Sequence, residues 1–146
     1  MTNEEYATGI TLAGRLKDVD LAAELFAEAA NKKLKETSLY NALMSAYMYN
    51  GLAAKCQLVF WDLRREETCK TTIVTYNIII SVFGRLMLVD NMETTLQEIK
   101  DLNLPPTLST YKNLNVGYIT AWRWDNMART YMIMKADDVK PDLSTH

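Results

Sequence analysis

The chain has 146 residues, of which 16 are basic and 18 are acidic, so its formal net charge is −2. Hydrophobic residues make up 49% of the chain, which has only five glycines, three prolines and two cysteines. This composition excludes a disordered tail, a collagen-like repeat and a disulfide scaffold. The excess of acidic residues argues against a protein that binds nucleic-acid phosphates mainly through its net charge.

The sequence shows neither a membrane span nor a targeting leader. No apolar run approaches the roughly 20 residues of a membrane helix, so we expect no membrane partner. The acidic start, Met1 to Glu5, lacks the basic and apolar regions of a signal peptide. The two cysteines, Cys56 and Cys69, fit a reducing compartment better than a disulfide-bonded secreted fold.

Apolar residues recur along the chain with one common spacing. The tyrosines Tyr6, Tyr40, Tyr76 and Tyr111 are separated by 34, 36 and 35 residues. The same three gaps separate a second column, Phe26, Phe60, Leu96 and Tyr131, and a third, Ala29, Leu63, Ile99 and Met134. Three columns that shift together indicate one structural unit repeated four times.

The columns divide the chain into units 3–36, 37–72, 73–107 and 108–142. We number the places of each unit from its first residue. Residues 143–146 repeat the opening of the fourth unit, which predicts the start of a truncated fifth unit. Each unit is expected to hold two helices, because its apolar residues follow a helical period and no segment sustains a period of two.

The helix signals differ from unit to unit. In the second unit, Asn50-Gly51 predicts a left-handed stop between the two helices. In the third unit we expect helices over about 74–83 and 89–102, with Asp90 as the N-cap of the second. In the fourth, Asp125 is expected to cap the second helix, which places Trp122-Arg123-Trp124 in the turn before it. The prediction is all-α: about eight helices in four hairpins, stacked as a right-handed α-solenoid.

Several motifs resemble the pentatricopeptide repeat family. Val74-Thr75-Tyr76-Asn77 opens one unit, Tyr40-Asn41 stands at the same place in another, and Val139-Lys140-Pro141-Asp142 closes a third. The competing tetratricopeptide repeats favour small residues at helix contacts where this chain has Met44 and Ile80. The plain, full-length units resemble the family's P-type members, which process and stabilise RNA.

The resemblance implies a protein that reads single-stranded RNA at about one base per repeat, through two or three side chains of each unit. It also implies a plant organellar protein, in the mitochondrion or chloroplast, that acts in transcript processing, splicing or stability; a transit peptide is not visible in this chain. The alternative is a protein-interaction solenoid with little or no RNA affinity, which could bind a protein partner or a second copy of itself.

The second, fifth and last places of a unit are the base-facing places that the resemblance implies. The candidates in this chain are Asn41, Thr72, Val74, Asn77, Thr107, Lys112 and Asp142. Asparagine at the fifth place fits the family, where it leans toward pyrimidines, whereas threonine at the last place is unusual. The first unit has Ala7 at its fifth place, and in the fourth Lys112 could pair with Asp142 instead of a base.

The role of the two asparagines is open, and the groove that they would face is expected to carry little charge. Asn41 and Asn77 could bond their own backbone instead of facing a ligand. The segments 38–49 and 74–83 carry no charged side chain, which predicts a polar but neutral groove that holds RNA by stacking and hydrogen bonds. Arg15, Lys17, Arg85 and Lys112 lie close enough in the register to add contacts.

The aromatic residues Trp61, Trp122 and Trp124 are candidates for a protein interface, although tryptophans more often fill space between helices. Catalysis has little support. His146 is the only histidine, so no histidine-based triad forms within the chain. Two cysteines thirteen residues apart, without a further cysteine or histidine near them, do not make a zinc site. We expect no enzyme activity, no metal and no cofactor.

Overall fold

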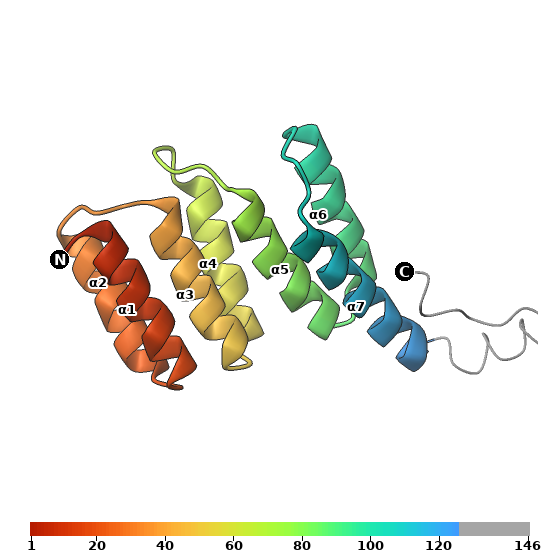
Figure 1. The fold of residues 1–146 in the computed structure, drawn as a ribbon, viewed down its shortest axis with the longest axis horizontal. Helices are drawn as coiled ribbons and strands as arrows, with labels where there is room; N and C mark the ends of the chain where they lie inside the picture. The colour runs from red at the N-terminus through yellow and green to blue at the C-terminus, as the bar shows by residue number, and fades with distance from the viewer. Residues whose placement is uncertain (126–146) are drawn as a thin grey trace, which may run out of the picture.

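The computed structural model describes residues 1–125 of the chain (Figure 1). Within that range the chain is helical, with no strand, which confirms the all-α prediction. The helices are α1 (Asn3–Arg15), α2 (Val19–Asn31), α3 (Thr37–Tyr49), α4 (Ala53–Arg65), α5 (Ile73–Arg85), α6 (Val89–Asp101) and α7 (Leu108–Asp125). The eighth expected helix and the expected fifth-unit start at 143–146 lie outside the described residues.

The helices form two layers, and the hairpins α1–α2, α3–α4 and α5–α6 stand in a row (Figure 1). The odd-numbered helices pack against one another, whereas each even-numbered helix packs mainly against the odd-numbered helices before and after it. The odd layer is therefore the more closely spaced one, so the stack curves with this layer on its inner side. This is the stacked-hairpin solenoid that the repeats predict.

The repeated columns supply much of the core, although Tyr111 of the tyrosine column is 53% exposed. Tyr6 and Tyr76 are buried almost completely, as are Leu63 and Ile99 of another column. An aromatic of α2 and one of α4 each meet the tyrosine of the next unit edge to face: the ring centroids are 5.1 Å apart for Phe26–Tyr40 and 6.1 Å apart for Phe60–Tyr76. Burial and edge-to-face geometry together stabilise the contact between units.

The first helices of three units end in the same way. Lys17, Gly51 and Met87 all stand at the fifteenth place and have φ values of 64°, 71° and 58°. After α1, for example, the Lys17 N–H donates to the Gly14 carbonyl (3.1 Å) and the Asp18 N–H to the Ala13 carbonyl (2.9 Å). This is a Schellman stop, which pairs carbonyls that the helix itself leaves free.

Two predictions about helix ends are wrong. α7 runs on to Asp125, so Trp122-Arg123-Trp124 lies in the helix and not in a turn; the helix that Asp125 was expected to cap lies outside the described residues. Trp122 stands at the fifteenth place of its unit, and a left-handed stop there would strain a bulky side chain by about 1–2 kcal/mol. Asp90 is not an N-cap either: Leu88 is, and Asp90 instead lies in the acidic first turn of α6.

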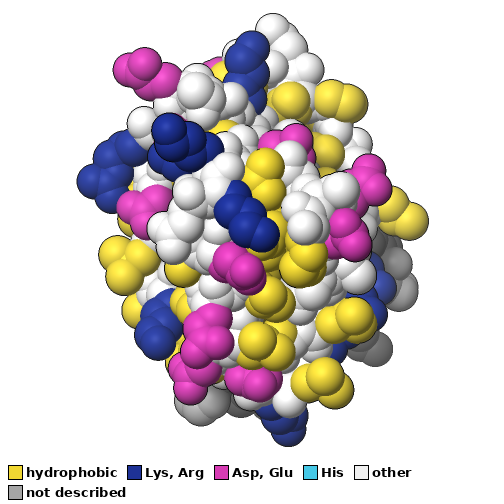
Figure 2. Space-filling view, turned by 90° about the vertical axis from the view of Figure 1, so that its left-hand side faces the viewer, with side chains coloured by type: hydrophobic (Ala, Val, Ile, Leu, Met, Phe, Trp, Pro, Cys, Tyr) yellow, Lys and Arg dark blue, Asp and Glu magenta, His cyan; other side chains and the backbone are white. Residues whose placement is uncertain are grey.

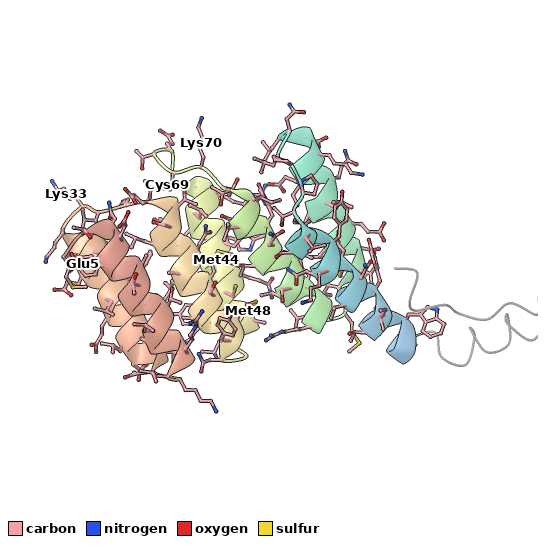
Figure 3. All side chains as sticks on the ribbon, viewed as in Figure 1. Glu5, Lys33, Met44, Met48, Cys69 and Lys70 are labelled. Carbon is pink, nitrogen blue, oxygen red and sulfur yellow. The ribbon has the colours of Figure 1, made fainter. Side chains whose placement is uncertain are left out.

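Small residues allow two pairs of neighbouring odd-numbered helices, α1–α3 and α5–α7, to pack closely. A Cβ added to Gly14 would lie 2.6 Å from the Ala46 Cβ, so α1 and α3 are almost in backbone contact. Gly84 and Gly117 make a similar approach between α5 and α7, at 3.0 Å from an added Cβ to the partner's Cα. At the α3–α5 junction the same places hold Met48, near the C-terminal end of α3 (Figure 3), and Val82. Their larger side chains separate this end of the two helices.

Candidate nucleic-acid interface

The inner surface of the odd layer is hollowed at two places. One depression of about 510 Å³ lies between α1 and α3, and its lining includes Arg15, Ser38, Asn41, Ser45 and Val74. The other, of about 380 Å³, lies between α5 and α7, and its lining includes Ser81, Arg85, Lys112, Asn113 and Thr120. Both are lined by polar side chains interspersed with apolar ones, from the same register of successive first helices.

Asn41 bonds the last residue of its own unit and the third residue of the following one. Its Nδ2 donates to Thr72 Oγ1 at 3.4 Å, and its Oδ1 accepts from Thr75 Oγ1 at 2.6 Å. Thr72 is exposed, whereas Thr75 is completely buried. The asparagine therefore joins α3 to the first turn of α5, and its amide lies at the edge of the depression between α1 and α3.

Asn77 repeats this arrangement one unit later. Its Nδ2 donates to Thr107 Oγ1 at 3.0 Å, and its Oδ1 accepts from Thr110 Oγ1 at 2.5 Å. Asn113 adds a bond from its Nδ2 to the Asn77 carbonyl at 3.0 Å. The side-chain partners of Asn41 and Asn77 thus lie on both sides of the boundary with the next unit, and neither amide bonds its own backbone. The fifth- and last-place residues singled out from the sequence are in contact in both units.

The other base-facing candidates lie around these clusters. Val74 is 52% exposed and lines the same depression as Asn41, which leaves an apolar surface beside the amide. Lys112 is exposed and lines the second depression with Arg85, whose Nη1 donates to the Met48 carbonyl at 2.9 Å. Asp142 lies outside the described residues.

Three of the four cations expected near the groove line the depressions. Arg15 lines the first depression, and Arg85 and Lys112 line the second, because both arginines stand at the thirteenth place, at the ends of α1 and α5. The rest of the charge is mixed: at the α1–α2 end of the molecule acidic, basic and hydrophobic side chains are interspersed (Figure 2). Within the described residues, by contrast, the linings of the two depressions include basic side chains and no acidic one.

A third hollow, of about 500 Å³, lies at the loop between α4 and α5. Its lining includes Arg64 and Glu98, which form an ion pair at 3.2 Å, and Tyr76, which donates to Glu98 at 2.6 Å. These polar groups already satisfy one another, so this hollow offers a ligand less than the inner surface does.

The tryptophans have different surroundings. Trp61 lies on α4 and is 49% exposed, with the Arg64 guanidinium 5.3 Å from its ring centroid. Trp122 is half-buried on α7. Trp124 lies on the same helix, but its side chain is outside the described part.

Residues 1–125 contain no cluster of three or more histidine, cysteine, aspartate or glutamate side chains that could hold a metal ion. None of the helices α1 to α7 combines the length and the apolar character that a membrane crossing requires.

Comparison with known proteins defines the family. A model of the pentatricopeptide repeat domain matches residues 25–85, and a model of the single PPR repeat matches residues 74–104. The chain belongs to the pentatricopeptide repeat family.

Relatives in Arabidopsis thaliana agree with this assignment. One pentatricopeptide repeat-containing protein is 54% identical over 106 residues, which cover 73% of this chain and 24% of the relative. A second is 49% identical over 110 residues, 73% of this chain and 22% of the relative. A third, whose name describes it as chloroplastic, is 28% identical over 139 residues. The chain thus spans about a quarter of the length of these relatives.

Solved structures agree on the fold. The crystal structure of the pentatricopeptide repeat protein PPR10 in complex with an 18-nt psaJ RNA element matches 94% of this chain and 20% of that one, with a TM-score of 0.69 and 22% identity. PPR10 from maize, in another crystal structure, matches 93% of this chain and 20% of that one, with a TM-score of 0.71 and 20% identity.

Proposed function

We propose that the chain binds single-stranded RNA along the inner surface of its odd-numbered helices. The observation that carries this proposal is the Asn–Thr pair that recurs in the same geometry one unit apart, at Asn41–Thr72 and Asn77–Thr107. A repeated polar contact facing a common groove suits a repeating ligand, and an unpaired amide hydrogen suits the edge of a base. Val74 supplies an apolar surface on which a base can stack.

The wider role follows from the family. We propose the four units 3–36, 37–72, 73–107 and 108–142 as repeats, with the second and third as the base-contacting ones. The similar PPR10 structure contains RNA, and some relatives are named chloroplastic, which supports a role in organellar transcript processing, splicing or stability. The chain would act by binding, with no catalytic residue of its own.

Retention of a random-sequence RNA pool in an electrophoretic mobility shift assay tests the proposal. The double variant Asn41→Ala/Asn77→Ala should bind the pool about tenfold more weakly, because two contacts to bases are lost. Asn91→Ala is the matched control, since it removes an exposed asparagine from α6, in the other layer. We expect this control to bind as the unmodified chain does.

The salt dependence of RNA affinity in the same assay gives a second test. Only three cations line the two depressions, so affinity should fall with salt more gently than for a protein with 6–10 phosphate contacts, which loses about 10³–10⁵ between 50 and 200 mM. No retained RNA at low salt, or equal loss in the Asn91→Ala control, would contradict RNA binding at this surface.

A second candidate function is protein binding through the outer layer. On α4, Leu58 is 62% exposed and Trp61 49% exposed, one turn apart on the same side of the helix. Trp122 and Trp124 stay predicted members of such an interface. Trp61→Ala should then abolish self-association in light scattering, or capture of a partner, while RNA affinity stays unchanged. An unchanged assembly state and partner set in this variant would speak against the candidate.

A further inference from the structure

The two asparagines of the proposed RNA surface are held by residues that the base-facing places do not include. Thr75 and Thr110 stand at the third place of the following unit, and both are completely buried. Their hydroxyls are the closest partners of Asn41 and Asn77. Each candidate base contact is therefore built across a junction, with its amide on one repeat and its anchor on the next.

The distances fix which end of each amide faces the threonine. The Oγ1 atoms lie 2.6 Å from Asn41 Oδ1 and 2.5 Å from Asn77 Oδ1, which is the range of O–H···O bonds and shorter than N–H···O bonds usually are. Thr75 Oγ1 also accepts from the Thr72 N–H at 3.2 Å, so its own proton is left to donate. A buried hydroxyl needs an acceptor, and the asparagine Oδ1 is the nearest one.

The orientation of each asparagine amide determines which of its hydrogen-bonding groups faces a ligand in the groove. With Oδ1 held by the buried hydroxyl, Nδ2 lies on the exposed side, where it donates one hydrogen to Thr72 or Thr107. The second hydrogen of each amide is left for the groove. An asparagine free to rotate could present either a donor or an acceptor, whereas these two present a donor.

The first junction of the chain provides an internal comparison. There the fifth place holds Ala7 and the third place of the next unit holds Leu39, which is buried. An apolar residue at one place thus accompanies an apolar residue at the other, and asparagine accompanies threonine at both later junctions. The two places behave as one coupled pair.

We propose that Thr75 and Thr110 are positioning residues that set base selection by the repeat before them. By holding the Asn41 and Asn77 carbonyls, they commit these amides to donate, and so favour a base that presents a carbonyl oxygen or ring nitrogen at the contacted position over one that presents an amino or N–H group there. This inference rests on the RNA binding proposed above.

The test compares four variants of the 146-residue chain with the unmodified chain. Thr75→Val/Thr110→Val removes both hydroxyls with little change of shape, and Thr75→Ser/Thr110→Ser restores them. Thr95→Val is the matched control, because Thr95 is also buried, at 6% exposure, but its hydroxyl bonds the Asn91 carbonyl within α6. The single Thr75→Val variant keeps the Asn77 cluster intact as an internal reference.

The first readout is independent of RNA. The side-chain amide signals of Asn41 and Asn77 in ¹⁵N NMR should move, and their hydrogens should exchange faster with water, in the double valine variant only. In single Thr75→Val the change should be confined to Asn41. Amide signals that stay in place in the valine variants would overturn the inference, even if the chain binds RNA.

The second readout is base selection. Binding of short oligonucleotides that differ at one base should show about a tenfold smaller spread of affinities in the double valine variant than in the unmodified chain. The serine variants should recover the spread, and Thr95→Val should keep it. A valine variant with unchanged selectivity overturns the proposal. If no form binds RNA, the proposed function fails, while the amide signals still decide whether the threonines position the asparagines.

Discussion

Burial governs the chemistry of single side chains in this core. It raises the pKa of Tyr40 and of Tyr76 from 10.0 to about 12, and for Tyr76 the hydrogen bond to Glu98 adds to the effect. It also raises the pKa of the Cys56 thiol from 9.0 to about 12. In each case the folded chain holds a proton that the unfolded chain releases more readily.

Alkaline pH should therefore destabilise the fold. Because the folded state binds these tyrosine protons more tightly, the free energy of unfolding contains a favourable contribution that is complete below pH 10 and is lost as the pH rises toward 12. Urea unfolding followed by circular dichroism from pH 8 upward measures the loss. Tyr76→Phe should lower stability at pH 8 by about 1–2 kcal/mol but flatten the decline, since its bonds to Glu98 and Thr71 disappear.

Tyr49→Phe, at an exposed tyrosine of α3, is the control for the alkaline decline. A decline that is as steep in Tyr76→Phe as in this control would show that the buried hydroxyl does not cause it.

The two cysteines should differ in reactivity. Cys56 is buried with a raised pKa, whereas Cys69 is half-buried in the loop between α4 and α5 (Figure 3). A thiol reagent such as DTNB at pH 8 should modify one thiol of the folded chain quickly and the second only with unfolding, because the thiolate is the reacting form. Cys69→Ser should abolish the fast phase. A fast phase that persists in this variant would place the reactive thiol at Cys56.

At the scale of elements, only some of the helix ends could be predicted from the sequence pattern. Gly51 predicts its left-handed stop because glycine favours positive φ. Lys17 and Met87 adopt the same conformation without any such signal, and the common register of the three stops is visible only once the units are aligned. Trp122, at the same place, shows that the register alone does not enforce a stop.

Lys17→Gly should stabilise the chain by about 1 kcal/mol. Lys17 is exposed and has a φ of 64°, so glycine would relieve the backbone strain without loss of packing. Thermal denaturation should show a rise in Tm. Lys17→Ala removes the side chain but keeps the strain, so it should leave Tm near that of the unmodified chain. An equal rise in both variants would mean that the side chain, and not the backbone, is responsible.

For the whole molecule, the close junctions of the odd layer should tolerate little added volume. A methyl group on Gly14 would meet Ala46 Cα at 2.7 Å, so Gly14→Ala should destabilise the chain by about 2 kcal/mol as α1 and α3 are pushed apart. Gly9→Ala, on the same helix, meets only Leu25 Cδ1 at 3.2 Å. That atom can move, so helix propensity should make this variant up to about 1 kcal/mol more stable.

Urea unfolding of the two glycine variants decides the matter. Equal effects at Gly9 and Gly14 would show that helix propensity dominates and that the α1–α3 contact does not limit the packing.

Repetition made most of the architecture predictable. The three apolar columns locate the helices and most of the core, because members such as Tyr6 and Tyr76 are buried at the same place of their units, although Tyr111 of that column is exposed. The columns also brought Asn41 and Asn77 to the inner surface. They did not reveal the roles of Thr75 and Thr110, because threonine stands at the third place in only two of the four units 3–36 to 108–142, and the partners of these threonines lie in the unit before. The sequence did hold a sign of this role: where the fifth place of one unit is Ala7, the third place of the next is the apolar Leu39, and where it is asparagine, the third place of the next is threonine.

The bond from Thr75 to Asn41 has a consequence for engineering with such repeats. A module excised at the boundary between residues 72 and 73 would leave its asparagine behind without the hydroxyl that orients it. Recombination would preserve the contact if the splice fell after the first turn of the following helix, so that each transplanted cassette carried its downstream threonine with it.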